Sequence, residues 1–417
     1  MKNIRQRAGL WLFDGLLIVL IFLALLLLSE ICLRGFLAVR GKPFVDTAAV
    51  DLHRQRLDWK KLNLGSPSKT RPVTEAYKEF PWAADYLAEA ERHPDPGLVY
   101  EPFSLWKHSP YQTRYVRYGE NGYRRTINPA KASFEKRCTV FVFGGSTIAG
   151  DGVLRDEDLI PSQLSEILNR LYPNTLFEVR SYAQSGFNQG NEVVLLARLL
   201  AGGERPNLVL FYDGDNDVVH RIGFGEPHMS YSFFKKSSSF FNYTIKDTIR
   251  MWLLSGLRNK SALLRSLLPP MEDPRAEEVY LAQDPQLIKK RSDGVAEFYA
   301  GNMDLVRALS EHYHFRHLLF LQPNVFTKRV RSVEEQQILE RVRAEASSLE
   351  EIFTVGYPAI RERFRDSGAG DFVDVTDLYQ ESPVSVYVDP AHVSPRGNLL
   401  IAQRIAEECL RRKLLPE

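Results

Sequence analysis

The residues of this chain that are best suited to chemistry are a serine and a histidine that lie far apart in the sequence. The histidine ends the run Asp389-Pro390-Ala391-His392, and Ser146 follows two glycines where an apolar run ends. An acid three residues ahead of a histidine can fold onto its ring, hold one ring nitrogen and leave the other as a base. A serine hydroxyl needs such a base to act as a nucleophile. The pattern predicts a serine hydrolase or acyltransferase with Ser146 as nucleophile, His392 as base and Asp389 as the group that orients the base.

Two further loops carry hydrogen-bond donors that acyl transfer requires. One loop, residues 183–190, contains Gly186, and the other, residues 213–217, contains Asn216. Attack on an ester places negative charge on the former carbonyl oxygen, and each donor aimed at that oxygen is worth about 10²–10³-fold in rate. We expect an oxyanion hole made by the backbone N–H groups of Ser146 and Gly186 and by the side-chain amide of Asn216.

Each of these motifs has a simpler interpretation when it is taken alone. Gly186 fits an ordinary turn, Asn216 a turn cap, and the final acid–histidine pair a helix-entry turn. The serine block lacks the Gly-Lys-Ser/Thr that would complete a phosphate loop. Gly150 lies four residues after Ser146, which does not fit a nucleophile elbow. All four motifs occur in order, each where a strand pattern ends, and this order favours the catalytic interpretation.

The chain holds no convincing ligand set for a metal ion. His312, His314 and His317 cluster in the sequence, but their spacing matches no usual ligand pattern. The acids that surround Asn216 lack the glycine and the terminal glutamate of a calcium loop. We therefore expect no metal and no organic cofactor.

From Arg137 onward, apolar strand patterns alternate with helical patterns. Strands are expected at 139–143, 176–182, 207–212, 317–321 and 372–375. Helices are expected at 158–171, 192–200, 295–310, 333–365 and 397–413, and a long insertion is expected at about 218–294. This alternation favours an α/β fold, a three-layer α/β/α sandwich around a parallel sheet. In such a sheet, sites lie beyond the carboxyl ends of the strands.

The N-terminus reads as a membrane anchor. Residues 9–30 are almost entirely apolar, with Asp14 as the main interruption. A helix of this length can cross a bilayer core of about 30 Å. No small-residue cleavage site follows, so we expect an uncleaved signal anchor rather than a signal peptide. Lys2, Arg5 and Arg7 precede the run and favour a cytoplasmic N-terminus at residues 1–8, although later basic residues nearly balance them. The catalytic domain would then be periplasmic or extracellular, on a single-pass protein of the inner (cytoplasmic) membrane.

Residues 31–136 separate the anchor from the expected hydrolase domain at 137–417. They contain many prolines and a run of tyrosines and arginines from Tyr100 to Tyr123. We interpret this stretch as a stem and a small accessory lobe, with the alternative that the tyrosines line a sugar-like substrate cleft. Cys138 and Cys409 could pair outside the cytoplasm, but two separate buried thiols are favoured because Cys138 opens a strand and Cys409 lies on an amphipathic helix.

Composition excludes some partners. The formal net charge is +2 and 25% of the residues are charged, and no long basic block is present. These values give no indication of a nucleic-acid partner.

The four motifs together resemble those of the SGNH (GDSL-like) hydrolase superfamily, over about residues 137–415. The first block here is Gly-Gly-Ser146-Thr rather than Gly-Asp-Ser, and in this it is similar to membrane-anchored bacterial members. The run Glu120 to Arg124 also resembles the lead-in of those members. The resemblance implies a flavodoxin-like sandwich, with Ser146, Gly186, Asn216, Asp389 and His392 in the roles given above. It also implies action on esters of lipids or sugars.

The sequence thus predicts a membrane-anchored serine esterase that removes O-acyl groups, with acetyl as the expected group, from an extracytoplasmic saccharide or lipid through an acyl-enzyme. An O-acetyltransferase that moves the acetyl group to a polysaccharide would use the same residues. A third hypothesis is a polysaccharide-binding or assembly protein whose site is vestigial.

Overall fold

The computed structural model describes residues 2–40, 75–93, 97–152, 155–225, 260–267, 281–368 and 370–416. The chain forms two compact units. One comprises residues 1–57 and 235–278, and the other comprises residues 58–234 and 279–417. The candidate site residues all belong to the second, which we call the catalytic unit.

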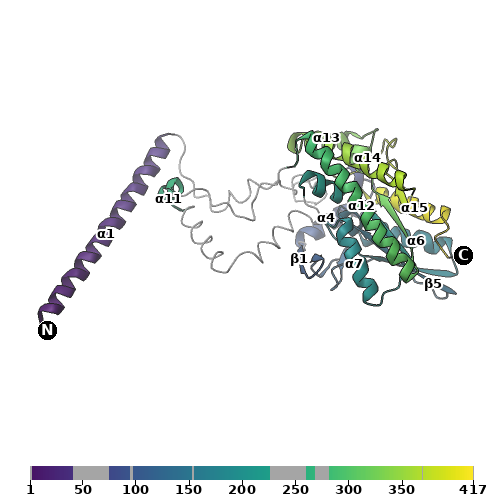
Figure 1. The fold of residues 1–417 in the computed structure, drawn as a ribbon, viewed down its shortest axis with the longest axis horizontal. Helices are drawn as coiled ribbons and strands as arrows, with labels where there is room; N and C mark the ends of the chain where they lie inside the picture. The colour runs from purple at the N-terminus through teal and green to yellow at the C-terminus, as the bar shows by residue number, and fades with distance from the viewer. Residues whose placement is uncertain are drawn as a thin grey trace. The chain divides into compact units, whose positions relative to one another are not determined.

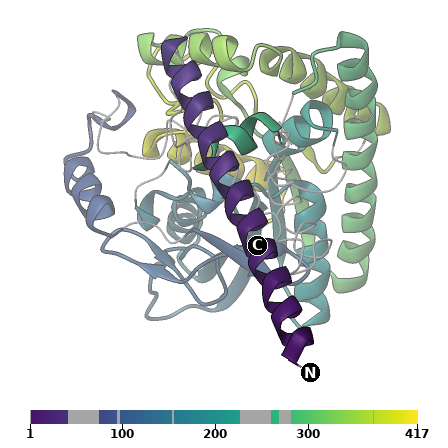
Figure 2. The same cartoon turned by 90° about the vertical axis from the view of Figure 1, so that its left-hand side faces the viewer.

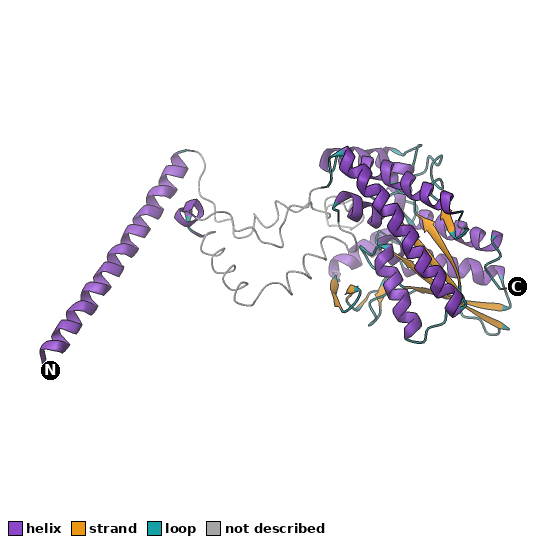
Figure 3. Ribbon diagram, in the orientation of Figure 1, coloured by secondary structure: helices purple, strands orange, loops and turns teal. Residues whose placement is uncertain are grey.

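A five-stranded parallel sheet lies at the centre of the catalytic unit (Figures 1 and 3). The strand order is β6-β5-β7-β8-β9. The strands are β5 (Lys136–Gly144), β6 (Thr175–Ser181), β7 (Leu208–Asp213), β8 (Arg316–Leu321) and β9 (Phe372–Asp374). The chain order reverses between β5 and β7, and an open parallel sheet places its ligand sites beyond the carboxyl ends of strands at such a point.

Helices cover both faces of this sheet. On one face α7 (Gln189–Ala201) and α14 (Leu349–Ser367) pack against α12 (Pro285–Tyr313), while α6 (Ile160–Leu171) packs against α15 (Pro395–Arg411) in a separate layer. Figure 2 shows α7 and α12 side by side along one edge of the unit. The predicted fold class, a parallel α/β/α sandwich, is confirmed.

The central strands are buried on both sides, which explains their near-continuous apolar sequence. Every residue of β7 is buried, and β5 is buried from Val140 to Gly144. At about 25 cal/mol per Å² of apolar surface removed from water, this burial is the main force that holds the layers together. The loops that follow β5 and β7 are therefore attached to well-packed strands.

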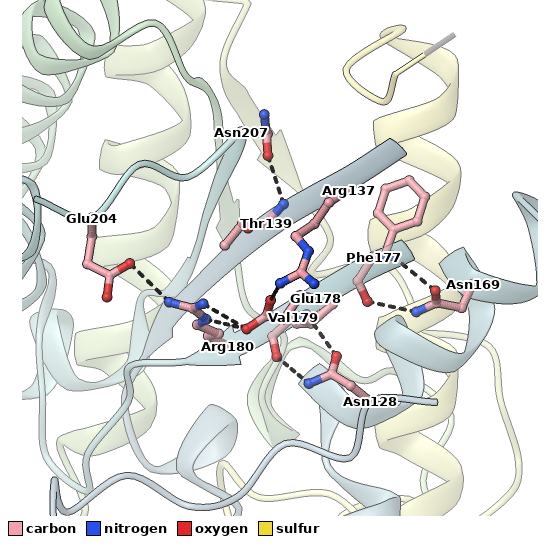
Figure 4. A network of polar contacts seen from close by, with 10 residues as sticks. All are labelled: Asn128, Arg137, Thr139, Asn169, Phe177, Glu178, Val179, Arg180, Glu204 and Asn207. Atoms are coloured by element: carbon pink, nitrogen blue, oxygen red, sulfur yellow. Dashed lines mark hydrogen bonds and ion pairs between the residues drawn. The ribbon is translucent and has the colours of Figure 1, made fainter. Parts of the chain in front are cut away.

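Side-chain amides protect the edge strand β6 (Figure 4). Asn169 donates to the carbonyl of Phe177 at 2.8 Å and accepts from its N–H at 3.0 Å. Asn128 does the same for Val179, at 3.0 and 2.8 Å. Unpaired strand edges invite pairing with other chains, and these two carboxamides satisfy the outward-facing backbone groups. β6 can thus end the sheet and leave its C-terminal loop fixed.

Two predicted elements differ from the structure. The expected single helix at 333–365 is two helices, α13 (Val333–Glu345) and α14, separated at residues 346–348. Ala346 leaves the helical region with φ −145° and ψ 63°, and its buried side chain and that of Leu349 turn the chain inward. The helix expected at 295–310 begins earlier, at Pro285, where Asp284 caps it by accepting from the N–H of Gln286. Pro285 at the first position of the helix loses no hydrogen bond, because an N–H there has no partner within the helix.

The segment ahead of the sheet forms small elements that belong to the catalytic unit. They are η1 (Glu75–Tyr77), α4 (Ala83–Arg92), β1 (Leu98–Glu101), β2 (Leu105–His108), β3 (Tyr111–Gln112) and β4 (Arg117–Tyr118). Tyr115 and Tyr118 are buried together with Val116. These two tyrosines therefore contribute to packing. Cys138 and Cys409 are both buried and unpaired, as the favoured interpretation held.

The other unit contains helix α1 (Lys2–Val39) and the short helix α11 (Ala262–Leu267). Within α1, Leu17–Val39 has a mean hydropathy of 2.6 and no buried residues, so it is long and apolar enough to cross a membrane. A signal sequence meets the same criterion. The side chain of Glu30 accepts from the backbone N–H groups of Ala262 and Leu263, each at 2.7 Å, and so joins part of the predicted insertion to α1.

Candidate active site

Ser146 lies at the point where β5 ends and the chain turns into a single helical turn. It is the first residue of α5 (Ser146–Ala149), which Gly150 ends in the left-handed region at φ 94°. Gly144 and Gly145 precede it and are both buried. The serine itself is partly exposed, although Gly145 before it and Thr147 after it are buried. A nucleophile in this place is rigid at its backbone and open to a substrate.

A tight turn just ahead of α15 carries the acid and the histidine. One carboxylate oxygen of Asp389 accepts from the backbone N–H of Ala391 at 2.9 Å and from that of His392 at 2.7 Å. An aspartate that binds backbone two and three residues ahead stabilises a turn. The carbonyl of Pro390 accepts from Val325 N–H at 2.9 Å and ties the turn to the loop after β8. The backbone that carries the His392 imidazole is therefore fixed by hydrogen bonds of its own, in addition to the contacts of the ring.

The three side chains form one hydrogen-bonded chain. His392 Nδ1 lies 2.6 Å from Asp389 Oδ2, and His392 Nε2 lies 2.7 Å from Ser146 Oγ. A neutral imidazole with its proton on Nδ1 donates to Asp389 and accepts at Nε2 from the serine hydroxyl. Asp389 and His392 are buried. This arrangement can remove the proton from Ser146 while the hydroxyl attacks an ester carbonyl.

Nearby charges tune the histidine. Burial alone lowers the pKa of His392, but the charge of Asp389 and the hydrogen bond to it, together with the charges of Asp151 and Asp215, raise that pKa to about 9. Burial also raises the pKa of Asp215 to about 6, partly offset by its hydrogen bond to Asn324. His392 is accordingly a stronger base than a free histidine.

The two predicted donor loops lie beside the serine. The Asn216 amide nitrogen donates to the carbonyl of Phe187 at 2.7 Å, which uses one of its two hydrogens and orients the other. A Cβ on Gly145 would lie 2.3 Å from that same nitrogen, so the Asn216 amide occupies the space next to the backbone of Ser146. Gly186 has φ 81° in the loop between Ser185 and Phe187. Ser146, Asp389 and His392 thus lie together with Asn216 close by, and the loop that contains Gly186 reaches Asn216 through the Phe187 carbonyl.

Several residues that hold the site were missed by the sequence analysis. Asp217 reaches across to another element and accepts from the N–H of Gln189, the first residue of α7, at 3.2 Å. Asp151 accepts from the Ser185 hydroxyl at 2.8 Å, and Trp106 donates to the Ser185 carbonyl at 2.9 Å. An isolated acid or tryptophan carries no sequence signal for such contacts.

No group of three or more His, Cys, Asp or Glu side chains among the described residues is arranged to hold a metal ion. His317 instead bonds Asp371, with Nε2 at 3.1 Å from Oδ2. The histidine cluster of the sequence is thus used in part for packing at the start of β8.

Comparison with known proteins gives similarity to solved structures only. No family model and no curated protein matches the chain. An alpha/beta hydrolase enzyme from the metagenome of Lake Arreo, Spain, is 14% identical over 66% of this chain and 96% of its own, with a TM-score of 0.34. The acetyl xylan esterase AlAXEase is 14% identical over 64% of this chain and 98% of its own, with a TM-score of 0.35. The psychrotrophic esterase EstA from Pseudoalteromonas sp. is 14% identical over 66% and 97%, with a TM-score of 0.28. At this level of similarity the function of the chain rests on the geometry of its own residues.

Proposed function

We propose that this chain is a serine ester hydrolase of the SGNH type, which removes an O-acyl group, with acetyl as the expected group, from a saccharide or lipid outside the cytoplasm. The observation that carries the proposal is the chain of contacts from Asp389 through His392 to Ser146, at 2.6 and 2.7 Å. The Asn216 amide beside the serine backbone supports it further. Helix α1 supports a single-pass anchor that keeps residues 1–8 in the cytoplasm and the catalytic unit on the other side.

In the proposed reaction, Ser146 Oγ forms a bond to the ester carbonyl carbon while its proton passes to His392 Nε2. The N–H groups of Ser146, Gly186 and Asn216 stabilise the negative charge on the carbonyl oxygen. When the intermediate collapses, the bond to the leaving alkoxide breaks and His392 gives that oxygen its proton. Water then attacks the acyl-serine, again losing a proton to His392, and the carboxylic acid is released with Ser146 restored.

Turnover of an ester by the full-length protein in detergent micelles tests this proposal. We expect hydrolysis of a chromogenic acetyl ester, and release of free acetate from an acetylated oligosaccharide. If the acetyl group instead appears on an added polysaccharide, the protein is an acetyltransferase with the same nucleophile. Absence of both products and of labelling by a fluorophosphonate would overturn the proposal in favour of a non-catalytic binding or assembly protein.

Activity should rise steeply with pH. Only the neutral form of His392 can accept the serine proton, and with a pKa of about 9 this form falls about tenfold for each pH unit below that value. We therefore expect kcat/KM for a neutral acetyl ester to increase from about pH 6, to be half-maximal at about pH 9 and to level off above that value. The measurement is the pH profile of kcat/KM, corrected for spontaneous hydrolysis. A profile that is already level at neutral pH would contradict the charge environment described for this histidine.

Gly145→Ala should damage the oxyanion hole. The added Cβ would lie 2.3 Å from the Asn216 amide nitrogen and 3.0 Å from the Phe187 carbonyl oxygen, so the amide must move away. We expect kcat to fall about 10²–10³-fold, the usual cost of one lost donor, with little change in KM. Gly301→Ala on α12 is the matched control, because nothing lies within 4 Å of its added Cβ. Equal activity of both variants would show that Asn216 has no part in the reaction.

A further inference from the structure

We propose that Trp106 is a positioning residue that sets the direction of the Gly186 N–H through its hydrogen bond to the Ser185 carbonyl. Asp151 holds the same loop through the Ser185 hydroxyl. This inference rests on the proposed function. It concerns one peptide unit, the one that joins Ser185 to Gly186. Trp106 lies on β2, well ahead of the nucleophile, in a part of the chain that the sequence analysis treated as accessory.

The loop is a tight turn with a defined type. Phe187 N–H donates to the carbonyl of Gln184 at 3.1 Å, and Gly186, the third residue of the turn, has φ 81°. Since Ser185, the second residue, does not have positive φ while Gly186 does, the turn is of type II rather than type I′. Types I and II differ by a flip of the central peptide, and here the central peptide is that between Ser185 and Gly186. The Gly186 N–H can therefore point in either of two opposite directions, one for each turn type.

Trp106 holds one of these states. Its indole Nε1 donates to the Ser185 carbonyl at 2.9 Å. In a planar trans peptide the C=O and the N–H point in opposite directions. A carbonyl held toward Trp106 therefore directs the Gly186 N–H away from β2. The indole has only 1% of its surface exposed and packs edge-on to Phe187 with ring centroids 5.4 Å apart, so it has little freedom to follow a flipped peptide.

Gln184, the first residue of the turn, is hydrogen-bonded to β2 and to Gly122. The Gln184 carboxamide accepts from the His108 N–H at 3.1 Å and donates to the carbonyl of Gly122 at 2.7 Å. Gln184 is itself buried. These two hydrogen bonds fix Gln184, the first residue of the turn. Because Gln184 cannot shift, the hydrogen bond from Trp106 fixes the orientation of the peptide between Ser185 and Gly186.

Asp151 ties the turn to the nucleophile. Its carboxylate accepts from the Ser185 hydroxyl at 2.8 Å, and its backbone N–H donates to the carbonyl of Ser146 at 2.9 Å. The next residue, Gly152, lies close to His392, since a Cβ added there would be 3.0 Å from His392 Cβ. One residue therefore fixes the separation between the nucleophile turn and the oxyanion turn.

The consequence is that a hydrogen bond donated outside the active site prepares a donor inside it. A hole that is already oriented costs no reorganisation when the charge develops, and a displacement of about 1 Å in such a group can cost about 10²-fold. Loss of the Trp106 hydrogen bond should weaken stabilisation of the transition state and leave binding of the ground state nearly unchanged.

The test compares Trp106→Phe, which keeps the aromatic packing on Phe187 but removes the N–H, with Trp82→Phe on the turn before α4 as the matched control. In the full-length protein we expect Trp106→Phe to lower kcat about 10–100-fold with KM within about twofold. Affinity for an alkylboronic acid, which forms a tetrahedral adduct with the serine, should fall by a similar factor. Trp82→Phe should stay within about threefold of the unmodified protein in all three quantities.

Asp151 gives an independent arm if Trp106→Phe does not fold. We expect Asp151→Ala to lower kcat about 10-fold, while Asp151→Asn, which still accepts from Ser185, should restore most of that loss. Unchanged kcat in both Trp106→Phe and Asp151→Ala, with the unmodified protein active, would overturn this inference and leave the proposed function intact. An unmodified protein that neither turns over an ester nor reacts with a fluorophosphonate would instead overturn the proposed function.

Discussion

Ser146→Ala is expected to lower kcat/KM for a chromogenic acetyl ester by about 10⁴–10⁶-fold, the largest of the effects that we predict for this protein. The substitution removes only the hydroxyl group, whose oxygen lies 2.7 Å from His392 Nε2. Without it no acyl-enzyme can form, and only the hole and the binding site remain to assist direct attack by water. The measurement is steady-state turnover of the full-length protein, with the thermal unfolding midpoint recorded alongside it.

A matched serine serves as the control for this substitution. Ser347 is exposed and lies between α13 and α14. Ser347→Ala should leave turnover and the unfolding midpoint unchanged. Substantial activity in Ser146→Ala, above about one-hundredth of the original, would show that the nucleophile lies elsewhere.

Asp389→Asn should have the next largest effect, a loss of about 10⁴-fold in kcat. The asparagine can still accept from the backbone N–H groups of Ala391 and His392, so the turn should persist. Its amide, however, would face Nδ1 with a donor, which favours the tautomer that carries the proton on Nε2. The hydroxyl of Ser146 then loses its acceptor.

The pH profile separates this explanation from a general loss of structure. The carboxylate of Asp389 is the strongest of the charges that raise the pKa of His392. Removing that charge should move the midpoint of the remaining activity to lower pH. Asp377→Asn is the control, since Asp377 is exposed and pairs only with Arg404 at 3.2 Å among the contacts described for it. A midpoint for Asp389→Asn at or above that of the unmodified protein would contradict the role given to Asp389.

The fold was predictable from the sequence where burial determines the residue pattern. Strands β5 and β7 are buried on both faces, so their apolar runs stand out, and their observed bounds lie within a few residues of those expected. The break between α13 and α14 was not predictable in the same way, because the amphipathic pattern continues through Ala346 and only the backbone leaves the helix there. Periodicity reports which side of an element is buried, and it reports the ends of the element less well.

The order of the site along the chain was also predictable, because three of its segments follow strands and the last one, with Asp389 and His392, directly precedes the final helix. The contacts that orient the site were not. Trp106 reaches Ser185 from 79 positions away, and nothing in the residues around either one indicates the pairing. Asp217 and Asp215 are two positions apart in one acidic run, yet one caps α7 and the other lies near His392. Such roles depend on the tertiary fold and not on local spacing.

The most direct test of the central claim is to find the acyl group on Ser146. The full-length protein would be mixed briefly with an activated acetyl ester, quenched in acid, digested and analysed by mass spectrometry. We expect an acetyl group on the peptide that contains Ser146, and none on that peptide from Ser146→Ala. Consumption of the ester with Ser146 unmodified at every quench time, and the acetyl group carried by another residue, would contradict the account.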